Sequence, residues 1–243
     1  MKTLKLFTVL LLIFFITSLS AEAQLFERLG KEATKMLTGS SGLSQDDATK
    51  GIKEALINGV TKGSDLVSKL DGYYKNPEIK IPFPSEAKKV ESTLRSIGMG
   101  KQADDAILSM NRAAEDAAVG AKDIFIDAIK QMSIQDAIAI IKGDTSAATN
   151  FLKRTTSTKL TEKFTPVIKT SLEKVNATKY WETAINGYNN IPFVTKMNPD
   201  LTAYVTKKAM DGLFSMIAKE EGSIRRDPLA RTSEILKKVF GGK

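Results

Sequence analysis

KQADDAILSMNRAAEDAAVG, residues 101–120, is the strongest helical signal in the chain. Its apolar residues recur at helical spacing and predict one apolar stripe, made of Ala103, Ala106, Ile107, Met110, Ala113, Ala114, Ala117 and Ala118. Most of the stripe is alanine, whose small side chain lets a neighbouring helix approach closely. The opposite face also carries Leu108 and Val119, so it is not wholly polar. We therefore expect a central helix with neighbours on two sides.

Arg112 lies on that opposite face, about 180° from the alanine stripe. Glu115 follows it at i+3 and Asp116 at i+4, and both are within reach of its guanidinium. If the helix is covered on both sides, Arg112 is partly buried and must be paired, because an unpaired buried cation is very costly. This cluster is either a polar lock that fixes how the helices meet or an anion clamp at the floor of a cleft. The lock is the favoured interpretation.

The rest of the chain also has helical patterns, and no convincing strand is found beyond two or three residues around 79–81. Further helices are predicted over about 44–70, 85–97, 121–132, 133–143, 144–175, 178–188, 200–217 and 227–240, with Pro166 kinking or splitting the helix over 144–175. The sequence predicts an all-α fold, a single-domain bundle of about nine helices around the central alanine-rich helix.

Two proline-containing loops interrupt the helices, over 71–84 and 189–199. The first, DGYYKNPEIKIPFP, has enough apolar residues to be an ordered loop packed on the domain. Aromatic residues in or beside the loops either line a pocket for an apolar ligand or fill the core, which is favoured. They are Tyr73, Tyr74, Phe83, Tyr180, Trp181, Tyr188 and Phe193.

The composition excludes several classes of chemistry. The 243 residues include no cysteine and no histidine, which excludes Ser-His-Asp and Cys-His catalysis, disulfides and the usual zinc ligands. The formal net charge of +8 is spread among acidic residues without a block of like charges, so we expect no nucleic-acid partner. Contact with an anionic membrane surface is compatible with this charge.

No metal or cofactor is predicted. The adjacent acidic pairs at 46–47, 104–105 and 220–221 are poor chelators, because neighbouring residues on a helix point about 100° apart. A solvated helix surface explains them better. Arg154 could form an anion site with other basic residues, namely Lys153, Arg225, Arg226 and Arg231. The favoured alternative is that these residues form salt bridges between helices, with Glu220, Glu221 or Glu234 as partners.

The N-terminus has the pattern of a secretory signal peptide. Lys2 and Lys5 precede an apolar run over residues 6–16, and Ala21-Glu22-Ala23 is a small-x-small cleavage site. We expect cleavage before Gln24. The apolar run is short for a membrane span, and no cysteine follows it to carry a lipid anchor. The prediction is export to the periplasm, or secretion, with no membrane span in the mature chain.

After the predicted signal peptide over residues 1–23, we expect a tether or short amphipathic helix over residues 24–42 and a helical domain over 43–241. The domain resembles the bacterial domain of unknown function (DUF) 4197 family. The matching stretches are DGYYKNPEIKIPFP, KVESTLRSIGMGKQADD, SMNRAAEDA, DIFIDAIKQMS, GDTSAATNFLKRTT and AYVTKKAMDGLFSMIAKEE…IRRDPLARTSEILKKVFG. The resemblance implies an exported helical protein without an established activity, and it supplies no functional residues.

The leading functional hypothesis is an exported, non-enzymatic binding module of the cell envelope, for an apolar or anionic ligand or for a protein partner. The alternatives are an enzyme that uses Asp or Glu with Arg or Lys, and a purely structural envelope factor. The candidate ligand- or anion-binding residues are Arg112, Glu115, Asp116, Arg154, Tyr74 and Trp181.

Overall fold

A computed structural model describes residues 44–190, 192–193, 195–227 and 237 of the chain. The predicted signal peptide, the segment over 24–42 and nearly all of the last predicted helix lie outside these residues. The α-helices are α2 (Gln45–Ser68), α3 (Lys88–Ser96), α4 (Gly100–Ala118), α5 (Ala121–Lys130), α6 (Ile134–Lys142), α7 (Ala147–Lys174), α8 (Ala177–Asn189) and α9 (Leu201–Arg226), and a 3-10 helix at Ser85–Ala87 precedes α3.

The all-α prediction is confirmed, since the described part of the chain contains helices and no strand. The predicted number of about nine helices is not found: the described residues hold α2 to α9 and one short 3-10 helix, and the helix predicted over 227–240 lies almost wholly outside them. Of the two alternatives predicted for Pro166, a kink or a split, the split is wrong, because α7 continues through this proline as one helix.

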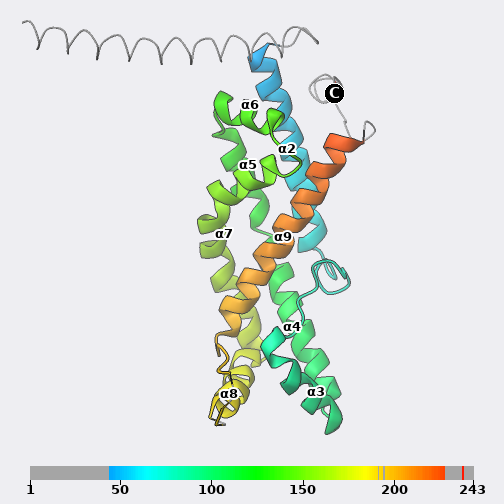
Figure 1. The fold of residues 1–243 in the computed structure, drawn as a ribbon, viewed down its shortest axis with the longest axis vertical. Helices are drawn as coiled ribbons and strands as arrows, with labels where there is room; N and C mark the ends of the chain where they lie inside the picture. The colour runs from blue at the N-terminus through cyan, green and yellow to red at the C-terminus, as the bar shows by residue number, and fades with distance from the viewer. Residues whose placement is uncertain (1–43, 191, 194, 228–236, 238–243) are drawn as a thin grey trace, which may run out of the picture.

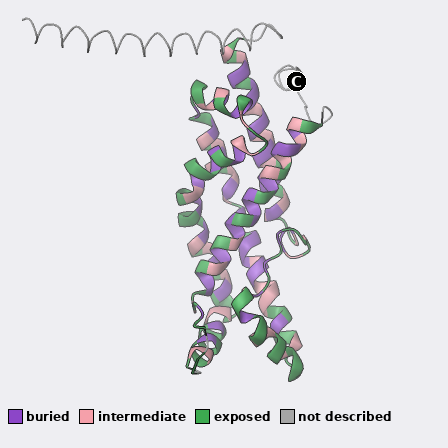
Figure 2. Cartoon of the chain, viewed as in Figure 1, coloured by how far each residue is buried: buried purple, intermediate pink, exposed green. Residues whose placement is uncertain are grey.

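The helices form an elongated bundle (Figure 1). α5 and α6 pack beside α2 at one end, and α3 and α8 lie at the other. α4 packs against α7, α9 and α2, so the central alanine-rich helix has neighbours on more than one side, as expected. Buried residues follow the faces on which the long helices meet (Figure 2).

The alanine stripe explains how α4 fits among these neighbours. Ala103, Ala113, Ala114 and Ala118 are fully buried, whereas Ala106 is only partly buried. A face made of alanine methyl groups lets the backbones of adjacent helices come close. The dispersion contacts of this close packing then stabilise the interface without large side chains. The stripe therefore places α4 in the core rather than on the surface.

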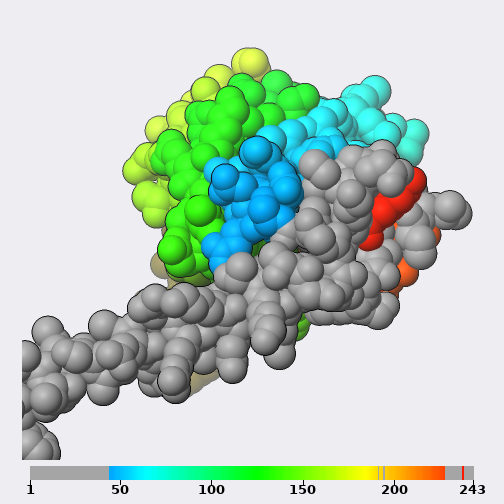
Figure 3. Space-filling model, turned by 90° about the horizontal axis from the view of Figure 1, so that it is seen from above, coloured from blue at the N-terminus to red at the C-terminus, as the bar shows by residue number. Residues whose placement is uncertain are grey.

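The loop over 71–84 connects α2 to the 3-10 helix and is packed on the bundle, as predicted. Tyr73, Ile79, Ile81 and Phe83 are buried, and the Tyr73 hydroxyl donates to the backbone carbonyl of Ala209 on α9 at 2.6 Å. The cyan residues that follow α2 stand at the side of the bundle in the view from above (Figure 3). The loop thus brings apolar side chains to α9 from a segment that has no helix of its own.

Gly212 on α9 makes this approach feasible. A Cβ atom at this position would lie 2.7 Å from Cε1 of Tyr73 and 3.1 Å from Cβ of Ile79. The first distance is shorter than real Cβ contacts and the second is tight, so any larger residue must push the loop away from α9.

We predict that Gly212→Ala destabilises the protein by about 1–3 kcal/mol through overpacking, as measured by urea unfolding. Gly187→Ala on α8 is the control, because nothing lies within 4 Å of its Cβ position. Alanine is also the better helix former by about 1 kcal/mol, so this control is expected to be neutral or stabilising. Equal stability of the Gly212→Ala and Gly187→Ala proteins would contradict the close packing of the loop.

Candidate functional site

Arg112 joins two carboxylates that come from different segments. Its Nη1 lies 2.5 Å from Oε2 of Glu115, and its Nη2 lies 2.6 Å from Oδ1 of Asp71 in the loop. The Arg112 side chain is 32% exposed, so the expected partial burial and pairing are both found. Asp116 is not a partner of this arginine: it is exposed and accepts from Ser171 Oγ on α7 at 2.8 Å. We call Asp71, Arg112 and Glu115 the Arg112 cluster.

Glu115 is the buried member of the Arg112 cluster, with a side chain only 4% exposed. Its Oε1 accepts hydrogen bonds from the backbone amides of Tyr73, at 3.0 Å, and Tyr74, at 3.1 Å. A buried carboxylate is tolerated only when it is paired and hydrogen-bonded, and Glu115 meets both conditions. The same side chain therefore fixes the start of the loop to α4.

Asn111, one helical turn before Glu115, binds the loop at a second point. Its Oδ1 accepts from the amide of Ile81 at 2.8 Å, and its Nδ2 donates to the Ile81 carbonyl at 2.8 Å. Asn111 was not among the predicted site residues, although the sequence around it contains a signal. Asn111 is a polar residue between Met110 and the alanines of the apolar stripe, and a buried polar side chain must find partners.

Asp71 combines a backbone and an electrostatic role. Its φ of 67° is left-handed, a conformation that Asp tolerates better than most residues and that turns the chain after α2. Lys75, whose Nζ lies 2.8 Å from Oδ2, and Arg112 hold the pKa of the Asp71 carboxyl below its ordinary value. The carboxylate is therefore ionised at neutral pH, as the pairing with Arg112 requires.

Tyr74 completes the surroundings of Arg112. Its ring centroid lies 5.6 Å from Cζ of Arg112 and 4.4 Å from Nζ of Lys80. The guanidinium thus faces two carboxylates and an aromatic ring, which balance its charge. This geometry supports the polar lock over the anion clamp, because an anion would have to displace Asp71 or Glu115.

The other two predicted site residues lie elsewhere. Arg154 is exposed on α7, where it pairs with Asp136 at 3.3 Å. Trp181 is buried on α8, with its ring centroid 5.8 Å from that of Phe83. The six candidates therefore do not form one site: Tyr74, Arg112 and Glu115 come together, and Asp116, Arg154 and Trp181 make separate contacts.

A second buried acid, Glu221 on α9, contradicts the sequence analysis, which placed the Glu220-Glu221 pair on a solvated surface. Its Oε1 accepts from the amide of Ala148 at 3.0 Å, and its Oε2 accepts from the amide and the hydroxyl of Thr149 at 2.9 and 2.8 Å. These amides belong to the first turn of α7, where backbone N–H groups lack helical partners and the helix dipole favours a negative charge. Glu221 therefore caps α7 from another helix.

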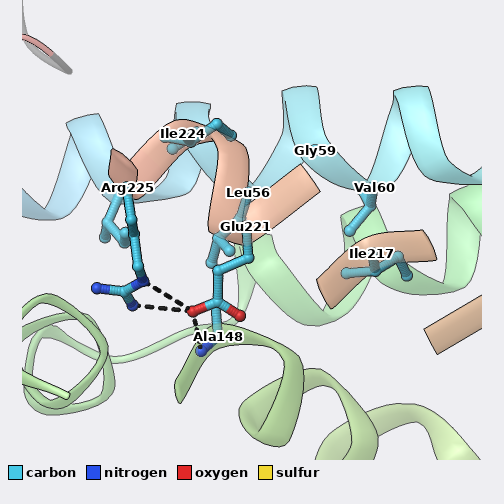
Figure 4. Close-up of a pocket in the computed structure, with 10 residues that line it drawn as sticks. Leu56, Gly59, Val60, Ala148, Ile217, Glu221, Ile224 and Arg225 are labelled. Carbon is cyan, nitrogen blue, oxygen red and sulfur yellow. Dashed lines mark hydrogen bonds and ion pairs between the residues drawn. The ribbon is translucent and has the colours of Figure 1, made fainter. Parts of the chain in front are cut away.

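Arg225 pairs with Glu221 in the same buried region (Figure 4). Its Nε donates to Oε1 of Glu221 at 3.0 Å, and its Nη2 donates to the carbonyl of Ile140 on α6 at 2.8 Å. Arg225 thus makes internal ionic and hydrogen bonds, the kind of contact that was favoured over an anion site for this residue.

Two hollows accompany these helices. A cavity of about 20 Å³ beside Glu221, lined by residues such as Leu56, Val60 and Ile217, has room for about one water molecule. A groove of about 370 Å³ between α7 and α9 is lined by Thr161, Thr165, Asp200, Thr202, Ala203, Thr206, Lys207, Met210 and Asp211. The aromatic residues of the two loops line neither hollow, and the burial of Tyr73, Phe83 and Trp181 agrees with core filling.

Within the described ranges, no group of three or more acidic side chains is arranged to hold a metal ion. None of the helices in that part of the chain is long and apolar enough to cross a membrane.

Comparison with known proteins gives one match. A family model described as "Protein of unknown function (DUF4197)" covers residues 42–241, which agrees with the resemblance found in the sequence. No curated protein matches the chain, and no solved structure does.

We predict that Arg112→Ala destabilises the protein by about 3 kcal/mol or more, because the buried Glu115 carboxylate loses its counter-ion. The control is Arg95→Ala, which removes an exposed arginine paired with Glu91 and Asp104 and should cost under about 1 kcal/mol. Thermal unfolding with and without phosphate measures both effects. An unchanged melting temperature in Arg112→Ala would refute the lock, and strong stabilisation of the wild-type protein by phosphate that Arg112→Ala abolishes would support the clamp instead.

Proposed function

This chain belongs to the DUF4197 family of proteins of unknown function, and we propose that it is an exported, non-enzymatic binding module of the cell envelope. The partner is bound at the surface of the bundle rather than in an internal pocket.

The pattern at the N-terminus supports the export part of this proposal. Two lysines, an apolar run over residues 6–16 and the Ala21-Glu22-Ala23 site follow one another in the order that signal peptidase substrates share. Because the chain has no cysteine, it cannot form disulfides in an oxidising compartment. Its stability there must come from packing and from the contacts of the two buried acids, Glu115 and Glu221.

The distribution of polar and apolar contacts supports the binding part. The charged groups that suggested a ligand site are bonded to one another and to the backbone of the protein, in the Arg112 cluster and around Glu221. Large apolar side chains such as Ile97, Tyr180 and Phe193 are instead exposed to solvent. The exposure of large apolar side chains on and beside α3 and α8, at one end of the bundle, is the observation that carries the proposal, since apolar groups that gather on a surface indicate a contact site.

Site-specific photo-cross-linking in intact cells tests both parts. A photoreactive phenylalanine analogue replaces Tyr180, which is 68% exposed, and in the control protein it replaces Leu70, which is 74% exposed on the side of the bundle. We expect a defined adduct from position 180 and little from position 70, on a chain whose N-terminal residue is Gln24. Equal cross-linking from the two positions, or an intact Met1 on the accumulated protein, would contradict the proposal.

A further inference from the structure

Phe193, in the connection between α8 and α9, occupies a position that the fold gives no reason to fill with phenylalanine. Its side chain is fully exposed, and its φ is 65°. A bulky residue in the left-handed region is strained, and glycine or asparagine would adopt the same backbone at lower cost. The side chain gains no packing in return. A strained and exposed aromatic residue is instead explained by contact with something outside the chain.

Other exposed apolar residues lie at the same end of the molecule. Val175 at the end of α7 and Tyr180 on α8 are both more than half exposed. Ile97 and Met99 are exposed on the turn between α3 and α4, and Figure 1 places α3 and α8 together at one end of the bundle. We call Val175, Tyr180 and Phe193 the α8 tip.

The charge at the α8 tip is positive. Lys174 precedes Val175 and Lys179 precedes Tyr180, while Lys196 follows Phe193 by three residues. All three lysines are exposed, and no ion pair joins them to another residue of the described ranges. Glu182 is the one acidic residue over 174–198; of the two that flank this range, Glu173 pairs with Lys169 at 3.9 Å and Asp200 caps α9. By contrast, Arg95 and Lys101 near the α3–α4 turn are neutralised by Glu91, Asp104 and Asp105.

We propose that the α8 tip docks on the surface of an anionic membrane. This inference rests on the proposed function and names the partner as a lipid surface. Phe193 and Tyr180 enter the headgroup region, where aromatic residues are favoured, and Lys174, Lys179 and Lys196 stay near the lipid phosphates. The contact is peripheral.

The spacing of these residues favours lipid over a protein partner. A protein interface needs a contiguous apolar centre with few charged residues, whose shape matches that of the partner. Along the sequence of the α8 tip, single exposed apolar residues alternate with lysines, as in Lys174-Val175 and Lys179-Tyr180. A headgroup layer accepts each apolar side chain separately and attracts the cations between them, so it suits this alternation.

Site-directed fluorescence gives the direct test. The chain has no cysteine, so a single introduced cysteine can be labelled with an environment-sensitive NBD probe. Phe193→Cys reports on the α8 tip, and Leu70→Cys is the matched exposed control on another face. The protein is purified as it accumulates in the cells that make it, so both variants share the same N-terminus. We expect vesicles with about one-third phosphatidylglycerol to shift the emission of the probe at 193 to shorter wavelength, with no shift at 70.

Charge variants of the unlabelled protein test the electrostatic part. Changing Lys174, Lys179 and Lys196 together to glutamine should weaken vesicle binding about tenfold or more at low salt. The control is the triple change to glutamine at Lys50, Lys62 and Lys142, which are exposed on α2 and α6 rather than on or beside α8. Sedimentation with vesicles measures both, and 0.5 M salt should abolish the difference between wild type and the first triple variant.

Three outcomes would overturn the inference: an unshifted probe at 193, equal shifts at 193 and 70, or equal losses of binding in the two triple variants. None of them bears on the in-cell adduct from Tyr180. A protein adduct at that position together with an unshifted probe at 193 would leave the binding module standing and remove the membrane as its partner.

Discussion

The structure depends on a buried carboxylate. Glu115, in the last turn of the central helix, has an almost fully buried carboxylate that accepts hydrogen bonds from the backbone amides of Tyr73 and Tyr74, while Arg112 neutralises its charge. Removal of its counter-ion would leave an unpaired buried carboxylate, so the loop, the arginine and the helix must form together. With Asn111 one turn earlier, α4 satisfies the backbone of a segment that has no regular secondary structure.

The loop then joins α4 to α9. Its Tyr73 hydroxyl reaches the carbonyl of Ala209, and Gly212 leaves the space in which the tyrosine ring lies. Near the other end of α9, Glu221 is likewise a buried carboxylate that accepts backbone amides from another segment, because it caps the N-terminus of α7. Both acids link segments that are far apart in the chain. These hydrogen bonds form only when the two segments meet at one position along each other. A purely apolar interface between alanine and leucine side chains would not enforce that register.

Local patterns were sufficient to predict much of this fold. The spacing of alanines in 101–120 predicted the central helix and its burial, and the i+3 spacing predicted the bond from Arg112 to Glu115. Spacing on one helix could not show that Asp71 would take the place of Asp116, because that depends on where the loop returns. Similarly, Glu221 has the sequence context of a surface residue, and only the docking of the α7 N-terminus makes it a buried cap.

Native-state hydrogen exchange tests most directly whether Glu115 and Asn111 hold the loop. The amides of Tyr73, Tyr74 and Ile81 donate to these side chains, whereas the amide of the exposed Glu78 donates to the side chain of Asn76 within the loop. If α4 holds the loop, the first three should exchange as slowly as amides in the middle of α4, and Glu78 should exchange much faster. Exchange of Tyr73, Tyr74 and Ile81 at the rate of Glu78 would show that the loop opens independently of the bundle, which would contradict the dependence of the fold on this buried carboxylate.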